Sequence, residues 1–160
     1  MESGQIESKS FVHCLHERAL DNFMNSIDIR YDFQKHLYRG ITLVVVNLSR
    51  AVMCESQVFY RYLFKVIDEG AEKIVIDISS LEFMDSSFAG VLVAALKRVK
   101  NKCGDIRLVI NNANLLTSQV LLNGIIKIYK TYPTIKKALQ SYEGEKEKVT
   151  PSISHLSFQK

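Results

Sequence analysis

The hydrophobic pattern changes its period in the middle of the chain, which predicts a strand, a turn and a helix in that order. Ile74 to Ile78 is a short run of β-branched residues between polar positions, and it predicts a strand buried on both faces. From Asp85 onward the apolar residues recur at three- and four-residue steps, as in an amphipathic helix packed on a sheet; they are Phe88, Val91, Leu92, Ala95 and Val99. The polar triplet Asp85-Ser86-Ser87 lies between the two patterns. Any of its side chains can accept a bond from the first free amides, so the helix is expected to begin there.

The pattern elsewhere predicts a hairpin followed by alternating helices and strands. The two hairpin arms are residues 29–37 and 41–48, and a helix begins at Glu55 or Ser56 and ends at Gly70. Later segments are a strand at 106–110, a helix at 113–122 with Gly124 as its C-terminal signal, a strand at 125–129 and a helix at 134–142. Crossovers in this order build a mostly parallel β-sheet with helices packed against it. The predicted fold class is therefore α/β.

The two ends of the chain differ from this middle part. Residues 11–27 place apolar side chains on one helical face, namely Val12, Leu15, Ala19, Phe23 and Ile27. An isolated helix of this length is marginal in water, so we expect it to pack on the domain or to form a homodimer with a second copy. From Glu143 onward no period is visible, which predicts a flexible tail. The expected organisation is an N-terminal helical extension (1–27), one domain (28–144) and a tail (145–160).

Composition and charge narrow the class of protein. Hydrophobic residues make up 47% and charged residues 24%, as in a soluble globular domain. The formal charge of +4 is spread along the chain, which does not favour a nucleic-acid surface. No signal pattern occurs and no apolar run approaches the roughly 18 residues of a membrane span, so we expect a cytoplasmic protein without direct membrane insertion. Three isolated cysteines suit a reducing compartment.

One cluster near the N-terminus admits a metal interpretation. His13, Cys14, His16 and Glu17 are close in sequence, and three of them are common ligand types. A second ligand pair does not follow downstream, so an ordinary helix surface is the favoured interpretation. We expect neither a metal nor a cofactor.

Two enzymatic interpretations of the central segment lack necessary residues. Ser86 stands where a hydrolase nucleophile would stand, but Met84 replaces the glycine of the nucleophile elbow, and the only later histidine is His155 in the predicted tail. A phosphoacceptor receiver domain would use Asp77, yet the preceding strand ends without the acidic pair that holds Mg²⁺. Asp77 is better explained as a strand-end residue that bonds the following turn. The sequence therefore favours a protein that is not an enzyme.

The run from Ile74 to Gly90 resembles the signature of STAS domains, the family of bacterial anti-sigma-factor antagonists and of the cytoplasmic domains of sulfate transporters. In the antagonists a strand and a short turn precede Asp-Ser-Ser-Gly-Leu-Gly, which opens a helix. The resemblance extends in register from about Asp28 to Gly144 and implies a STAS-like fold. The family's phosphoacceptor is the first serine, which falls on Ser86.

The resemblance also implies a partner-switching mechanism. A serine protein kinase and anti-sigma factor of GHKL type phosphorylates the serine, the phosphorylated protein releases the kinase, and a PP2C-type phosphatase restores binding. Asp85 beside the acceptor either adds to the negative field or only caps the helix. The alternative is a STAS subunit that works unmodified, as a scaffold in a signalling complex or as a cytoplasmic subunit of a lipid or anion transporter.

Departures from the family motif concern the expected partner surface. Phe88 occupies the position of the first glycine after the serines, whereas the second glycine is retained as Gly90. Phe88 is either an aromatic anchor for a partner or a core residue, and the family's glycine at a recognition surface favours exposure. The loop 49–56 is expected at the same end of the sheet. The predicted partner-binding residues are Asp85, Ser86, Ser87, Phe88, Gly90, Met53 and Glu55.

Overall fold

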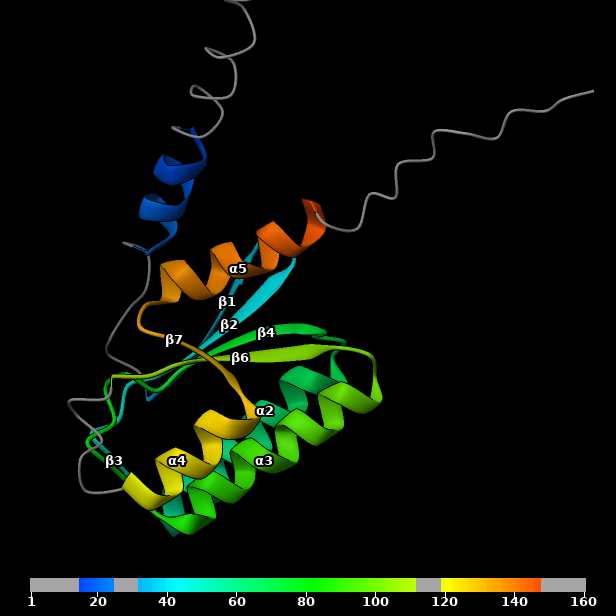
Figure 1. The fold of residues 1–160 in the computed structure, drawn as a ribbon. Coiled ribbons are helices and arrows are strands. Elements are labelled where there is room, and N and C mark those ends of the chain that lie inside the picture. Colours follow the sequence, from blue (N-terminus) through cyan, green and yellow to red (C-terminus); the bar gives the residue numbers. More distant parts are fainter. Residues whose placement is uncertain (1–14, 25–31, 112–118, 148–160) are drawn as a thin grey trace, which may run out of the picture.

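The computed structural model describes residues 15–24, 32–111 and 119–147, and it is built around one five-stranded sheet (Figure 1). The strand order is β1-β2-β4-β6-β7. The bounds are β1 Phe33–Tyr38, β2 Ile41–Val46, β4 Lys73–Asp77, β6 Asp105–Val109 and β7 Lys130–Tyr132. Strands β1 and β2 are antiparallel, and every later pairing in this sheet is parallel. The prediction of a mostly parallel sheet preceded by a hairpin is confirmed.

The hairpin turn has the backbone conformation that two-residue hairpin loops require. Arg39 and Gly40 connect the paired residues Tyr38 and Ile41, and both have positive φ, at 50° and 79°. Two positive φ angles in succession match the right-handed twist of the flanking strands. Gly40 adopts a positive φ without steric cost, whereas Arg39 adopts it at some steric cost because it has a side chain.

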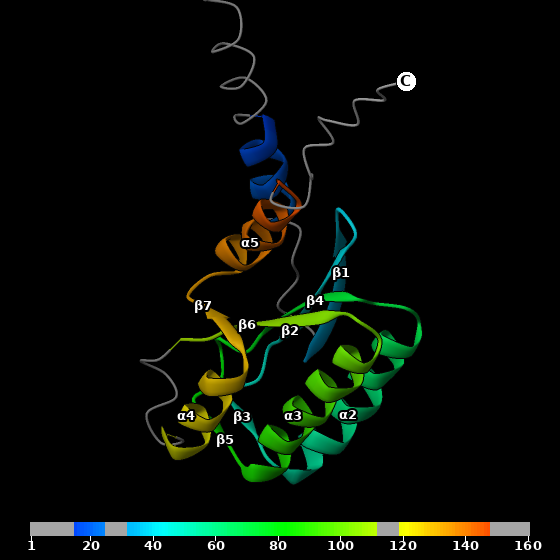
Figure 2. The same cartoon turned by 45° about the vertical axis from the view of Figure 1, so that its right-hand side comes forward.

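Helices cover both faces of the sheet (Figures 1 and 2). One face carries α2 Met53–Asp68, α3 Ser86–Asn101 and α4 Gln119–Ile128. The other face carries α5 Ile135–Glu147 and the N-terminal helix, which we define as residues 15–24. None of the helices in the described part of the chain is long and apolar enough to cross a membrane.

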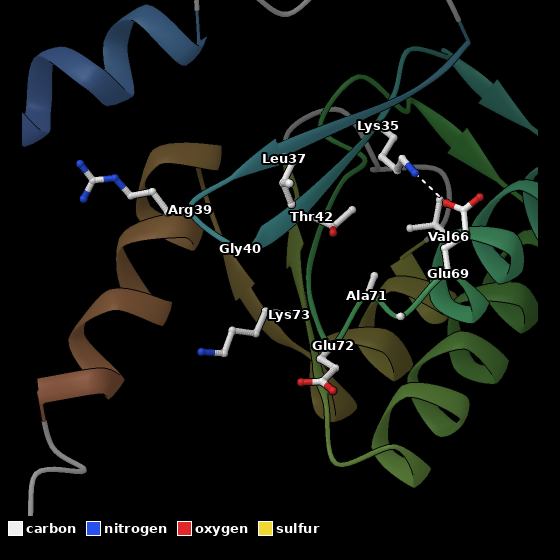
Figure 3. Close-up of a pocket in the computed structure, with 11 residues that line it drawn as sticks. Lys35, Leu37, Arg39, Gly40, Thr42, Val66, Glu69, Ala71, Glu72 and Lys73 are labelled. Atoms are coloured by element: carbon white, nitrogen blue, oxygen red, sulfur yellow. Dashed lines mark hydrogen bonds and ion pairs between the residues drawn. The ribbon is translucent and has the colours of Figure 1, made fainter.

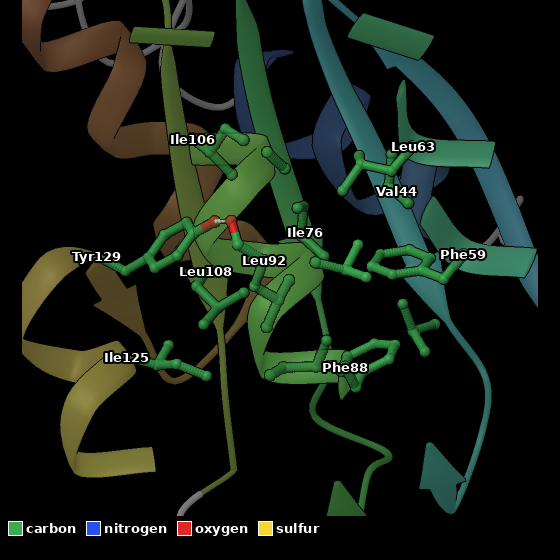
Figure 4. Close-up of a cluster of buried hydrophobic side chains, with 14 of the residues drawn as sticks. Val44, Phe59, Leu63, Ile76, Phe88, Leu92, Ile106, Leu108, Ile125 and Tyr129 are labelled. Carbon is green, nitrogen blue, oxygen red and sulfur yellow. Dashed lines mark hydrogen bonds between the residues drawn. The ribbon is translucent and has the colours of Figure 1, made fainter. Parts of the chain in front are cut away.

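Alternation along the strands divides the core into two clusters. Val44, Ile76 and Leu108 point toward α2 and α3, where they pack with Phe59 and Phe88 (Figure 4). Strand side chains of the opposite parity pack under α5 and the N-terminal helix, which contribute Leu139 and Leu20; these strand side chains include Leu43, Val45, Val75 and Val109. Successive side chains of a strand face opposite sides, so continuously apolar strands such as β2 feed both clusters.

The helix predicted at 113–122 is confirmed for residues 119–122, and 113–118 lie outside the described residues, but the predictions for residues 124–129 are wrong. Gly124 does not end a helix, and residues 125–129 are not a strand, because α4 runs from Gln119 to Ile128 and the strand β7 follows it. Leu122, Ile125 and Tyr129 are all buried at three- and four-residue steps, which is helical spacing. The Tyr129 hydroxyl donates to the carbonyl of Leu92 in α3 at 2.6 Å. Packing on α3 therefore overrides the β-preference of the isoleucines.

The N-terminal helix packs on the sheet within the same chain, but the side of the helix that is buried differs from the predicted one. Leu20 is fully buried, whereas Leu15 is 49% exposed and Ala19 is also exposed. Phe23, which the prediction did include, lies against Tyr38 with ring centroids 4.9 Å apart. The polar residue His16 shares the buried side because its Nε2 lies 2.6 Å from Oε2 of Glu143. Sequence reasoning could not identify the buried side of the helix, because this contact joins residues 127 positions apart.

Candidate functional site

A second, very small sheet brings the predicted loop and the serine segment together. β3 Arg50–Ala51 pairs in parallel with β5 Phe83–Met84. The amide of Asp85 donates to the carbonyl of Ala51 at 3.1 Å, which fixes the residue before the serines. The start of α2 and the start of α3 therefore lie at the same end of the main sheet. Sequence reasoning placed the loop at this end but missed the two strands, because two-residue strands carry no periodic signal.

Asp85 caps α3 and leaves the following serine at the surface. Its Oδ1 accepts from the amide of Phe88 at 3.0 Å, and its backbone carbonyl accepts from Ala89 at 3.1 Å. Ser86 is the first residue of the helix and is exposed, and its hydroxyl bonds no other described residue. The amides of Ser86 and Ser87 precede the first intrahelical bond, so a negative charge placed there meets the positive end of the helix dipole.

The expectation that Phe88 is exposed is wrong. Its side chain is 0% exposed and stacks on Phe59, with ring centroids 4.9 Å apart and an angle of 18° between the planes (Figure 4). Its three-residue step to Val91 places both on the side of the helix that faces the sheet, whereas Ser86 and Gly90 face solvent. Phe88 therefore belongs to the core and offers no anchor to a partner.

Of the remaining predicted partner-binding residues, Met53 and Gly90 are exposed, whereas Glu55 has a structural role. Met53 is 61% exposed, and it lines a groove between α2 and α3 of about 620 Å³ that Ser87 also lines. Gly90 is exposed, and a Cβ added there would meet nothing within 4 Å, so the fold itself does not require glycine. Glu55 is half-buried and accepts the amide of Val52 at 3.2 Å, which makes it part of the cap of α2.

Sequence reasoning missed the residues that continue this groove along α2. Gln57, Tyr60 and Arg61 line it together with Met53. The available signal was the helical spacing of exposed apolar residues, because Tyr60 lies seven positions after Met53. That signal is weak, since isolated exposed apolar residues are common on helices.

Asp77 has the structural role that the sequence favours. Its Oδ1 accepts from the amide of Ser79 at 2.9 Å, in the turn that follows β4. Burial raises the pKa of Asp77, and the hydrogen bonds from Ser79 oppose this only in part. A carboxylate used in this way is turned away from solvent. The described residues contain no group of three side chains suited to a metal ion, and His13 and Cys14 lie outside them.

A separate cavity lies at the opposite end of the sheet (Figure 3). It measures about 530 Å³ and is bordered by the hairpin, the C-terminal end of α2 and the start of β4. Lys35 and Glu69 close one side of it with an ion pair of 2.7 Å. Lys73 begins β4, whereas Ser86 follows its other end, so this cavity is remote from the serine.

Comparison with known proteins identifies the relatives of this chain. The family model described as STAS domain matches residues 44–138. A putative anti-sigma factor antagonist of Thermotoga neapolitana is 33% identical over 100 residues, which cover 62% of this chain and 83% of that protein.

Solved structures give the same fold. The crystal structure of a putative anti-sigma factor antagonist of Thermotoga maritima superposes with a TM-score of 0.59 at 25% identity, over 71% of this chain and 96% of that one. The Bacillus cell fate determinant SpoIIAA, solved in its phosphorylated form, has a TM-score of 0.55 at 18% identity, over 69% and 98% of the two chains. At that identity the second likeness concerns the fold alone.

Proposed function

This chain belongs to the STAS domain family, and we propose that it is a non-catalytic partner-switching protein of the anti-sigma factor antagonist type, controlled by reversible phosphorylation of Ser86. The observation that carries the proposal is the placement of Ser86, exposed at the first position of α3 with its hydroxyl free of bonds to other described residues. A kinase can reach such a hydroxyl without unfolding any part of the domain. Ser87, one position later, is half-buried beside Met53.

The switch acts through the charge of the phosphate. Transfer of the γ-phosphoryl group of ATP to Ser86 Oγ releases ADP and adds about 1.5 to 2 negative charges. The N-terminus of α3 tolerates this charge, so the domain keeps its fold. A partner that covers Ser86 must instead desolvate the phosphate, and acidic groups of the partner are repelled. Binding is therefore lost without a change of shape in this protein.

The partner in this proposal is a serine protein kinase and anti-sigma factor of GHKL type, and a PP2C-type phosphatase reverses the modification in the cytoplasm. One finding supports an anti-sigma factor as the partner. The relative from Thermotoga neapolitana is described as a putative anti-sigma factor antagonist. This chain has no role as a catalyst in the proposal, because it supplies only the accepting hydroxyl.

Phosphate incorporation by the cognate GHKL-type kinase tests the assignment to Ser86. Wild type, Ser86→Ala and Ser87→Ala are incubated with the kinase and ATP, and phosphopeptides are mapped. We expect incorporation in wild type and Ser87→Ala and none in Ser86→Ala, which should still fold and bind the kinase because Ser86 is exposed and the cap of α3 is Asp85. Label that persists in Ser86→Ala would refute the assignment.

Intact mass of the protein purified from its native cells provides the second test. A species heavier by one phosphoryl group supports the switch. If the unmodified mass alone is found under all growth conditions, the protein works unphosphorylated and the proposed control is wrong.

A further inference from the structure

The groove between α2 and α3 continues from the serine surface along the two helices, which lie side by side in Figure 2. Its walls come from both helices and are formed by Met53, Gln57, Tyr60, Arg61, Ser87 and Val91. Arg61 follows Met53 by eight positions, which corresponds to roughly 12 Å along a helix. The groove is thus long enough for about two turns of a helical segment.

Exposed apolar side chains give the groove the character of a docking surface. Met53 is 61% and Tyr60 45% exposed, although both are large. Tyr60 stacks on Phe64 with ring centroids 4.1 Å apart, so its orientation is fixed before any partner arrives. Methionine, tyrosine and arginine are enriched in protein interfaces, and a preoriented ring reduces the entropy lost on binding.

Arg61 gives the groove an uncompensated positive charge. Its Nε donates to the carbonyl of Gln57 in the same helix at 3.4 Å, and none of the acidic side chains in the described ranges forms an ion pair with it. Arg98 on the neighbouring helix differs, since it donates to Asp68 at 2.7 Å. A guanidinium without a carboxylate, placed in an apolar groove, is complementary to a segment that supplies one.

We infer that this groove docks an amphipathic helical segment of the protein partner, with apolar side chains on Met53 and Tyr60 and a carboxylate at Arg61. The inference rests on the proposed function in one respect, because the occupant is taken to be the partner that covers Ser86. Ser87 and Met53 belong both to the serine surface and to the groove, so a protein bound at Ser86 extends directly into it. The groove selects the partner, whereas Ser86 controls whether it stays bound.

Photo-crosslinking of the full chain in its native cells tests this inference. Benzoylphenylalanine replaces one residue at a time: Gln57 in the groove, Gly90 on the serine surface or Leu37 at the remote cavity. Leu37 is 72% exposed and serves as the control for unspecific capture. We expect positions 57 and 90 to crosslink to the same protein. The peptide captured from position 57 should carry apolar residues at three- and four-residue steps and an Asp or Glu beside them.

Charge variants at Arg61 sharpen the test. Arg61→Glu should lower the crosslink yield from position 57 by about fivefold, the upper range for an exposed ion pair. Arg61→Lys keeps the charge and should retain most of the yield. Arg61 is exposed, so neither change should alter the thermal melt.

The outcomes separate this inference from the proposed function. Crosslinks from position 90 without any from position 57 overturn the groove but leave the switch at Ser86 intact. A captured segment without acidic residues, or an unchanged yield in Arg61→Glu, also overturns the inference. If neither position captures a protein, the groove and the partner surface at Ser86 both fail, and phosphate mapping decides separately whether Ser86 is modified.

Discussion

The two faces of the sheet hold their helices by different means. Under α2 and α3 the contacts are mainly apolar, and the stacked rings of Phe59 and Phe88 lie at their centre (Figure 4). Under α5 the strands also direct buried polar side chains toward the helices, because Gln34, Asp77 and Arg107 share the strand parity of Tyr38, Val75 and Val109. One face depends on shape and apolar area, the other on specific polar partners as well.

The polar face is organised around Arg107, whose side chain is fully buried. Its Nη2 lies 2.6 Å from Oε2 of Glu145, and its Nη1 donates to the hydroxyl of Ser141. The guanidinium carbon lies 3.5 Å from the ring centroid of Tyr142, which adds a cation–π contact. All three of these partners belong to α5, so Arg107 fixes the position of that helix on the sheet.

The family match divides the molecule in a related way. It covers residues 44–138 and therefore includes all of α2, α3 and α4. Glu143 and Glu145 lie beyond it, as does the N-terminal helix. The helices of the apolar face and the serine surface thus belong to the part shared with the family. The helices on the polar face also use residues outside the family match, namely Glu143, Glu145 and the N-terminal helix. Substitutions on the two faces should consequently differ in how much they lower the free energy of unfolding and in the type of interaction that they remove.

The largest effect is expected at the centre of the apolar face. Phe88→Ala should lower the free energy of unfolding by about 3 to 5 kcal/mol, because it removes a fully buried ring and leaves a cavity against Phe59. Phe88→Leu retains much of the volume and should cost less. Urea unfolding measures both. A loss below about 1 kcal/mol in Phe88→Ala would contradict the core placement, since exposed sites change stability by no more than about half that.

On the polar face, Arg107→Ala should cost about 3 kcal/mol of unfolding free energy, in the range for truncating a large, fully buried side chain. It also removes the ring contact with Tyr142. Arg107→Met fills most of the space without the charge, and we expect it to recover most of the stability, because Glu145 is 55% exposed and stays hydrated after it loses its partner. The same unfolding assay tests both variants. If Met is as harmful as Ala, the charge itself holds α5.

Cover by the N-terminal helix should contribute less, since the helix is short and lies at the periphery. Leu20→Ala is expected to cost about 2 kcal/mol, the low end for a buried leucine. Leu15→Ala is the matched control on the same helix. Leu15 is 49% exposed, so its loss should stay within about 0.5 kcal/mol. Thermal melts in which Leu15→Ala costs more than Leu20→Ala would mean that the helix packs through the face predicted from the sequence.

The features that the sequence predicts correctly are those set by neighbouring residues. The hairpin, the alternation of helices and strands, the start of α3 at Asp85 and the turn-bonding role of Asp77 follow from local patterns and capping rules. The burial of Phe88 was equally compatible with its spacing, but the glycine at the matching family position suggested exposure. The other wrong predictions concern segments whose structure depends on tertiary contacts. Tyr129 bonds α3, and His16 meets Glu143 across 127 positions. Local patterns contain no information on partners so far away in the chain.

A smaller effect of opposite sign is expected on the serine surface. Gly90→Ala should raise the free energy of unfolding by about 0.5 to 1 kcal/mol, because alanine is the better helix former and its methyl group meets no neighbouring atom. If a partner's backbone approaches Gly90 closely, the same change weakens partner binding. A pull-down and a thermal melt of one preparation separate the two effects. Unchanged binding would place Gly90 outside the interface.

The smallest effect concerns Asp77 on the polar face, and it depends on pH. Burial raises the pKa of this carboxyl, so folding disfavours its charged form. The stabilising contribution of the neutral form is complete below the unfolded pKa of about 3.9 and is lost as pH rises through the higher folded pKa. Asp77→Asn keeps an oxygen acceptor for the amide of Ser79 and cannot ionise. We therefore expect the variant to be more stable than wild type at pH 7, with the difference shrinking toward pH 4. Asp77→Ala, which leaves that amide without its acceptor, should be less stable than Asp77→Asn at every pH. Urea unfolding of all three proteins across this range decides the matter: a difference between wild type and Asp77→Asn that stays constant with pH would show that the ionisation of Asp77 is not linked to folding.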